Sequence, residues 1–192
     1  MRDIAALTFV TLDGVMQAPS QPEEDKSYGF EDGGWAAPYW NGVMDHVQRE
    51  AMTERYDMLF GRKTYDLFAG HWPNQPQDPA ARAMNEARKY VVTSRTTDLA
   101  WSNSKAISGD VFREIAQLKA QEGPLLQIHG SWALIQSLLS KDLIDEFRIW
   151  TFPVVAGAGK RLFGSNARRR TLKLKKTEAS PGGPVMSIYR RT

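Results

Sequence analysis

Short β-rich runs alternate with helical patterns along most of the chain. An apolar run at Ile4–Thr11 is followed by three shorter runs, at residues 58–60, 89–94 and 125–128. Turn-forming residues bound each run, as is usual for buried parallel strands. The alternation is typical of the α/β class, so we expect these four runs to form a parallel sheet covered by helices.

Three of the intervening segments carry the apolar stripe of an amphipathic helix. Residues 41–55 repeat apolar side chains at spacings of three and four. Asp110 and Ser131 each precede another such stripe, at residues 111–118 and 132–139. Because Ser and Asp are common N-cap residues, we expect both to cap the helices that follow them.

The last third of the chain has a different pattern. Residues 146–153, 172–178 and 184–190 are strand candidates, and only the turn Ser180-Pro-Gly-Gly separates the last two. We therefore expect an antiparallel hairpin at the C-terminal side of the sheet. The longest irregular stretch lies at residues 14–38, and a loop of that length in a compact domain is commonly functional.

Composition narrows the class of protein. The chain has 192 residues, 42% of them hydrophobic, which suits one domain over residues 1–192. Its charge of +3 comes from 25 basic and 22 acidic residues, a small excess that does not favour a nucleic-acid partner. The densest basic run, at residues 168–176, alternates with apolar residues after Thr171 and predicts a strand with one solvated face.

Several kinds of site are not expected. The chain has no cysteine, which excludes disulfides and thiolate chemistry. His46, His71 and His129 lack metal-binding spacing, so we expect no metal. No leader sequence and no apolar run of membrane-spanning length is visible, so we expect a cytoplasmic protein without a membrane partner.

Three junctions between a strand and the following segment form the candidate ligand site. The run at residues 58–60 leads through Gly61 into Arg62-Lys63-Thr64, which combines free backbone N–H groups, two cations and a hydroxyl. The other junctions are Ser94-Arg95 and Gly130-Ser131. Ligands of open α/β sheets bind at the carboxyl ends of strands, so the three junctions together suit a ligand with several phosphates.

A purely structural interpretation of these junctions stays open. Gly61 and Gly130 would then make turns, Arg95 would be a solvated loop residue, and Thr64 and Ser131 would only cap helices. Neither the Walker motif nor G-x-G-x-x-G occurs in the chain.

A set of motifs in a fixed order resembles the dihydrofolate reductase superfamily. The motifs are TLDG at residues 11–14, LFGRKTY at 59–65, VTSR at 92–95, LIDE at 143–146 and PVVAGAGKRLF at 153–163. The chain is most similar to the branch that contains the C-terminal reductase domain of the bifunctional riboflavin-biosynthesis deaminase/reductase. The resemblance implies a three-layer α/β/α fold with a mostly parallel central sheet, an antiparallel C-terminal strand and a binding site for NADPH.

The resemblance also implies roles for the three junctions. The first junction, Gly61 to Thr64, would approach the pyrophosphate and the adenosine side of NADPH, and Gly130 and Ser131 would complete the cradle. Ser94 and Arg95 would lie at the adenosine 2′-phosphate. A guanidinium suits a dianionic phosphate, whereas NAD would call for an acidic residue at the ribose.

The substrate side is less defined. Trp35, Tyr39 and Trp40 are candidates for stacking on a flat heterocycle, or they pack into the core. Trp40 stands where folate reductases carry the carboxylate that binds the pterin, which disfavours dihydrofolate. Asp13 is a candidate to bind the substrate or to supply a proton, although Asp-Gly is also an ordinary turn dipeptide.

The sequence therefore predicts an NADPH-dependent reductase of a small heterocycle, acting on a CH–NH or C=N bond. It would be related to the 5-amino-6-(5-phosphoribosylamino)uracil reductase of riboflavin biosynthesis. A non-catalytic nucleotide-binding module and a true dihydrofolate reductase are the alternatives. Relatives in this branch are commonly homodimers, and the strand at residues 147–152 offers aromatics for an interface, unless Trp150 fills the core.

Overall fold

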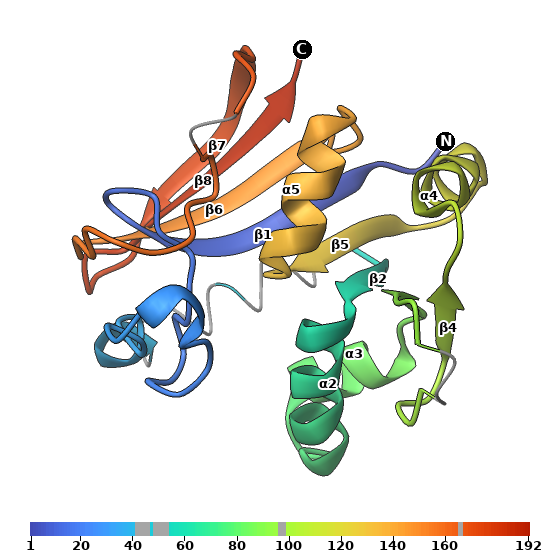
Figure 1. Cartoon of the computed structure of the whole chain (residues 1–192), viewed down its shortest axis with the longest axis horizontal. Helices are drawn as coiled ribbons and strands as arrows, with labels where there is room; N and C mark the ends of the chain where they lie inside the picture. Colours follow the sequence, from blue (N-terminus) through green and yellow to red (C-terminus); the bar gives the residue numbers. More distant parts are fainter. Residues whose placement is uncertain (41–46, 48–53, 96–98, 165–166) are drawn as a thin grey trace.

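A single sheet organises the computed structural model, which describes residues 1–40, 47, 54–95, 99–164 and 167–192. Within these residues the sheet has eight strands in the order β4-β3-β2-β5-β1-β6-β8-β7 (Figure 1). The strands are β1 (Ile4–Thr11), β2 (Tyr56–Gly61), β3 (Lys89–Val92), β4 (Ser104–Ile107), β5 (Leu125–His129), β6 (Glu146–Phe152), β7 (Leu172–Ala179) and β8 (Val185–Arg191). Neighbours from β4 to β6 pair in parallel, and β8 is antiparallel to both β6 and β7.

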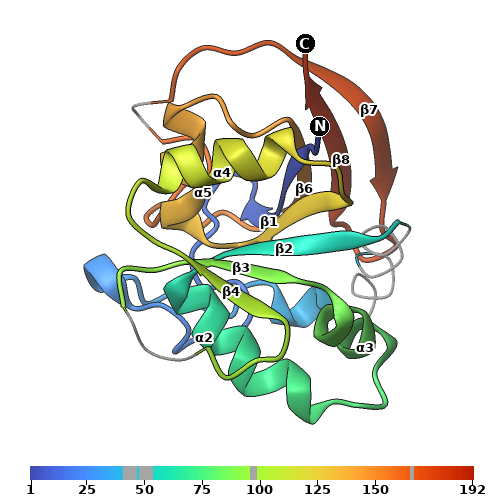
Figure 2. The ribbon, with the colours of Figure 1, turned by 90° about the vertical axis from the view of Figure 1, so that its right-hand side faces the viewer.

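Helices cover both faces of the sheet. The described helices are α2 (Arg62–His71), α3 (Pro79–Glu86), α4 (Val111–Ala120) and α5 (Trp132–Ser140), with short 3₁₀ turns η1 (Ser27–Gly29), η2 (Ala37–Tyr39) and η3 (Trp72–Asn74). Figure 2 shows α4 and α5 on one side of the sheet and α2 and α3 on the other. The expected three-layer α/β/α architecture is confirmed.

The central strands are apolar because both of their faces are covered. In β1 seven of the eight residues are buried, and only Phe9 is partly exposed. Strands of this kind show no polar–apolar alternation, which is why the run at Ile4–Thr11 is hydrophobic except for Thr8 and Thr11. The aromatics of β6 are also internal, since Phe147, Trp150 and Phe152 are at most 1% exposed. Trp150 therefore fills the core, and these aromatics do not form an interface.

Some expected elements differ from the structure. Strand β3 ends at Val92, so Thr93 and Ser94 lie beyond it. Strand β4 and helix α3 have no counterpart among the expected elements: β4 is an edge strand with two of its four residues exposed, and α3 is a short helix capped by Asp78. The helix expected at residues 41–55 lies outside the described residues, except for Val47 and the non-helical Glu54 and Arg55.

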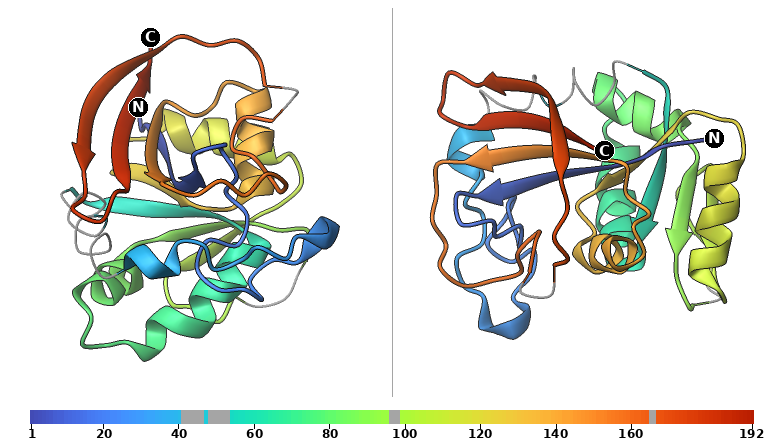
Figure 3. Two further views of the ribbon diagram at one scale, coloured as in Figure 1. Left: turned by 90° about the vertical axis from the view of Figure 1, so that its left-hand side faces the viewer. Right: turned by 90° about the horizontal axis from the view of Figure 1, so that it is seen from above.

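The C-terminal hairpin is confirmed. Ser180 N–H donates to Pro184 O at 2.8 Å, and Gly183 N–H donates to Ser180 O at 3.0 Å, which closes the turn between β7 and β8. Strand β7 lies at the outer margin of the sheet (Figure 3). It is exposed along nearly its whole length, so the expectation of one solvated face understated its exposure. None of the described helices is long and apolar enough to cross a membrane.

A lysine without exposed surface begins β3. Lys89 is 0% exposed, and its ammonium group donates to Asn85 O at 2.8 Å and to Ser102 O at 3.1 Å. The ammonium nitrogen lies 4.3 Å from the ring centre of Trp101, a cation–π distance. Burial lowers the pKa of Lys89 to about 8, because an apolar environment disfavours the charged form.

Lys89 should make stability depend on alkaline pH. The pKa of this lysine in the folded protein, about 8, lies below its ordinary value of 10.5, so between these values the unfolded chain binds more protons. The free energy of unfolding should therefore rise with pH across this window, by roughly 3 kcal/mol from this group. Urea denaturation of wild type and Lys89→Met at pH 7.5, 9 and 10.5 measures the difference, and parallel pH profiles would contradict the assignment.

Candidate functional site

The three predicted junctions meet at one edge of the sheet. Strands β3, β2 and β5 are adjacent and parallel, so their carboxyl ends lie side by side. Gly61 N–H donates to Ser131 Oγ at 3.1 Å, which joins the end of β2 to the start of α5. The junction at the end of β3 meets the first turn of α2 in a pocket. The structure thus brings all three junctions together.

This pocket has a volume of about 650 Å³ and a basic lining. Its lining residues are Arg62, Lys63, Asp66, Val92, Thr93, Ser94, Arg95, Ser108, Gly109 and Val111. Four predicted residues are among them, whereas Gly61, Thr64, Gly130 and Ser131 lie beside the pocket rather than in its lining. Ser108 and Gly109 were missed because they follow β4, the strand that the sequence pattern did not indicate.

The first turn of α2 presents cations to this pocket. Gly61 occupies the N-cap position with an extended backbone, φ −77° and ψ 153°, and makes no side-chain cap hydrogen bond to the turn. Arg62 Nε donates to both carboxylate oxygens of Asp66, at 2.8 and 3.0 Å, which orients the guanidinium along the helix. Arg95 is exposed and also lines the pocket. Positive charge and the start of a helix suit an anionic ligand.

Ser131 does not cap α5 as predicted. It has left-handed backbone angles, φ 57° and ψ 58°, directly after Gly130 with φ 61°. In this conformation its hydroxyl makes no cap hydrogen bond and instead accepts the N–H of Gly61. Ser131 therefore ties two strand–helix units together.

Asp13 has a structural set of partners. Its carboxylate accepts hydrogen bonds from Thr11 Oγ1 at 2.6 Å, Gly157 N at 2.9 Å and Ala156 N at 3.1 Å. Arg161 also lies within 3.1 Å. The bond from Thr11, aided by these backbone N–H groups and opposed by burial, holds the pKa of Asp13 well below its usual range. The carboxyl is thus ionised at neutral pH, which favours the turn interpretation over a proton donor.

The three candidate aromatics pack against aromatic residues of the sheet, namely Phe152 of β6 and Phe9 of β1. Trp35 is 8% exposed, and its Nε1 donates to Gln17 O at 2.8 Å, so it belongs to the core. Tyr39 lies edge-on to Phe152 with ring centres 5.8 Å apart, and Trp40 lies at the same separation from Phe9. Tyr39 and Trp40 are partly exposed, so substrate stacking stays a prediction for these two.

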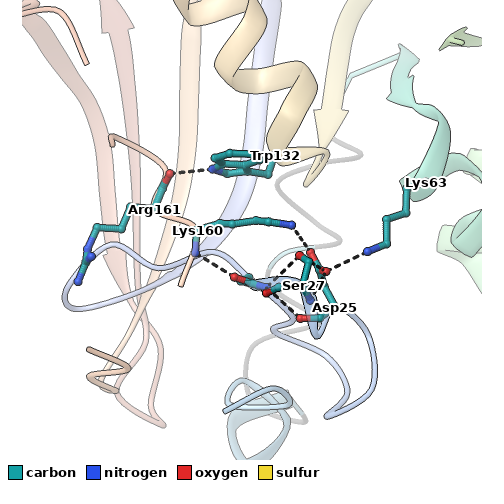
Figure 4. A network of polar contacts seen from close by, with 7 residues as sticks. Asp25, Ser27, Lys63, Trp132, Lys160 and Arg161 are labelled. Carbon is teal, nitrogen blue, oxygen red and sulfur yellow. Dashed lines mark hydrogen bonds and ion pairs between the residues drawn. The ribbon is translucent and has the colours of Figure 1, made fainter. Parts of the chain in front are cut away.

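A network not anticipated from the sequence crosses the same edge (Figure 4). Asp25, in the long loop (residues 14–38), bridges Lys63 Nζ at 2.9 Å and Lys160 Nζ at 2.6 Å. Gln17 Nε2 donates to the backbone oxygens of Asp25 and Ser27, at 3.0 and 2.9 Å. Burial opposes ionisation of Asp25, but bonds from Lys160, Ser27 and Lys63 outweigh it and keep its pKa below the usual range.

Comparison with known proteins places the chain in a family. Residues 2–186 match the model of the RibD C-terminal domain, and the chain belongs to this family. The resemblance to the reductase branch of the dihydrofolate reductase superfamily is thereby confirmed. Family membership supports an oxidoreductase of the kind that acts in riboflavin biosynthesis.

Two curated relatives come from Bacillus subtilis strain 168, and both are described as uncharacterized. YyaP is 31% identical over 137 residues, which cover 69% of this chain and 72% of YyaP. YwjB is 38% identical over 122 residues, which cover 63% of this chain and 66% of YwjB.

Two solved structures share the fold. A putative riboflavin biosynthesis protein from Shewanella sp. PV-4 has a TM-score of 0.65 at 19% identity, with 99% of both chains covered. A pyrimidine reductase-like protein from Corynebacterium diphtheriae has a TM-score of 0.58 at 11% identity, with 100% of this chain and 92% of the other covered.

The contact between Ser131 and Gly61 should be measurable in stability. Ser131→Ala leaves the Gly61 N–H without its acceptor, and the free energy of unfolding should fall by about 1 kcal/mol. Ser137→Ala on the same helix removes an exposed hydroxyl that donates to Ala133 O, and should change it by less than about 0.5 kcal/mol. Urea denaturation compares the two variants, and equal effects would contradict a specific role for Ser131.

Proposed function

We propose that the chain is an NADPH-dependent reductase of a small heterocyclic substrate. The observation that carries this proposal is the basic pocket at the carboxyl edge, where Arg62, Lys63 and Arg95 surround one cavity of about 650 Å³. A volume of this size suits a small-molecule ligand. The family supports a reductase, and the pocket supports a phosphorylated dinucleotide.

The lining residues fit the adenosine end of NADPH. Arg95 and Ser94 offer a cation and a hydroxyl to a 2′-phosphate, and Lys63 lies in the first turn of α2 beside them. Asp66 is the acidic residue of the lining, but its carboxylate is engaged by Arg62. The pocket therefore offers cations, rather than a free carboxylate, to the ribose, which favours NADPH over NADH.

The gap between α2 and α5 is the proposed path of the pyrophosphate. Gly61 and Gly130 let the backbone approach a ligand closely, and the Ser131 hydroxyl fixes the two junctions relative to each other. When bound, the cofactor supplies a hydride to the substrate. The protein contributes binding and orientation.

The substrate is proposed to be a flat, nitrogenous ring reduced at a CH–NH or C=N bond. Two of the similar solved structures are described in terms of riboflavin biosynthesis and a pyrimidine reductase, which supports a pyrimidine-type ring. Tyr39 and Trp40 are the proposed stacking residues. Dihydrofolate remains disfavoured, since the resemblance implies that Trp40 stands at the position of the pterin-binding carboxylate. A non-catalytic nucleotide-binding module is the alternative, and substrate-dependent NADPH oxidation separates the two.

We also propose a cytoplasmic homodimer. Since the aromatics of β6 are internal, the surface proposed for the second copy is the face of β1, β6 and β8 beside α5. A small pocket of about 230 Å³ opens there, and Leu12 and Phe163 are 64% and 43% exposed. Exposed apolar residues of this size suit an interface.

NADPH should stabilise the fold against heat. A ligand at about 100 times its dissociation constant adds roughly 2.7 kcal/mol to the free energy of unfolding, because it binds only the folded state. Differential scanning fluorimetry with NADPH, NADH and buffer measures the shift in Tm. We expect a larger shift with NADPH than with NADH, and an unchanged Tm at saturating NADPH would contradict the proposed function.

Arg95→Ala should discriminate between the two cofactors. The 2′-phosphate is the group that NADPH has and NADH lacks, so the variant should bind NADPH roughly ten- to a hundredfold more weakly and NADH unchanged. Arg82→Ala, which alters an exposed arginine of α3 outside the pocket lining, is the matched control. Fluorescence titration gives both affinities. Equal loss for both cofactors would place Arg95 away from the 2′-phosphate.

A further inference from the structure

The Asp25 bridge joins three segments that are distant in sequence. Lys63 comes from α2, Lys160 from the segment between β6 and β7, and Asp25 from the long loop. The side chains of Asp25 and Lys160 are 17% and 15% exposed, whereas that of Lys63 is 72% exposed. The bridge therefore has one well-shielded pair and one pair open to solvent.

Lys63 belongs to two arrangements at once. It binds Asp25, and it also lines the basic pocket. A lysine side chain is a flexible stem with a point charge, so it can serve either a loop carboxylate or an incoming anion. The two interactions compete, because an ammonium group that is paired with Asp25 attracts a ligand anion less strongly.

Lys160 is enclosed more tightly than an ordinary surface cation. Its ammonium nitrogen lies 5.4 Å from the ring centre of Trp132 and 5.5 Å from that of Tyr28. Trp132 is itself fixed, since its Nε1 donates to Arg161 O at 3.0 Å (Figure 4). Lys160 N–H also donates to Gln17 Oε1 at 3.0 Å. The loop is thus anchored at Lys160 and held across the edge at Lys63.

We propose that Asp25 is a charge latch: its carboxylate takes the place of a ligand anion between Lys63 and Lys160, and an anionic group must displace it to gain these cations. The inference rests on the proposed function in that the natural ligand is an anionic dinucleotide. The latch lowers the apparent affinity of the site, since only unlatched molecules bind. A latch closed in nine molecules of ten reduces that affinity about tenfold.

The test compares two carboxylates of the same loop. Asp25→Asn removes the latch charge, whereas Glu23→Gln removes an equal charge from an exposed residue that pairs with Lys26. Isothermal titration calorimetry measures the binding of inorganic pyrophosphate and of NADPH to both variants and to wild type. We expect Asp25→Asn to bind pyrophosphate roughly tenfold more tightly than wild type, and Glu23→Gln to match wild type.

Other results of the titrations would overturn either the latch or the proposed cofactor. Unchanged or weaker pyrophosphate binding by Asp25→Asn, an equal gain in Glu23→Gln, or no pyrophosphate binding to any variant overturns the latch. Tighter pyrophosphate binding together with no NADPH binding in any variant supports the latch and rejects the proposed cofactor. The failure of one proposal is therefore distinguishable from failure of the other.

Limited proteolysis provides a second measurement. Lys26 follows Asp25 in the loop, and trypsin cleavage after it reports how often the loop opens, since cleavage of a rapidly closing segment tracks the open population. Asp25→Asn should be cleaved there about tenfold faster than wild type. If Asp25→Asn does not fold, Lys63→Gln alters the exposed partner of the latch and should also accelerate cleavage. An unchanged rate in Lys63→Gln would then overturn the proposal.

Discussion

Parallel pairing of β2 with β3 and β5 is the constraint on which the rest of the structure depends. Parallel strands place all their carboxyl ends at one edge, so three separate junctions must meet there. The contact between Gly61 and Ser131 then fixes the spacing between α2 and α5. The first turn of α2 then supplies Arg62 and Lys63 to the pocket, and the long loop reaches Lys63 through Asp25.

The cations at this edge are paired with carboxylates, whose place a ligand anion can take. Arg62 has Asp66, and Lys63 and Lys160 share Asp25. Paired cations cost less to hold close together than bare ones, because each carboxylate offsets the repulsion between them. A site of this kind is stable without a ligand and still strongly cationic once a carboxylate moves away.

The elements that sequence analysis predicted are those with a strong local signal. The apolar runs of β1 and β5 and the Pro-Gly-Gly turn are visible because burial and turn geometry restrict their residue types. Strand β4 has no such signal: it is a four-residue edge strand, and Lys105 and Ala106 are exposed. The clustering of Arg62 and Arg95 followed from parallel topology, whereas the Asp25 bridge did not. Its partners lie 38 and 135 residues away, beyond any periodicity. The prediction that Ser131 caps α5 was wrong. Its residue type suits a cap, but Gly130 and Ser131 both adopt a left-handed backbone.

The exposure of β7 carries a consequence for the behaviour of the protein at high concentration. No other strand of the described residues pairs with the outer side of β7, and the margin of a sheet can serve as a template for pairing with another molecule. Lys173, Lys175 and Lys176 stand along this margin and are exposed. If the β7 margins of two molecules approached each other, these lysines would repel one another. Lysines at these positions thus oppose edge-to-edge aggregation, a property separate from ligand binding and from the packing of the core.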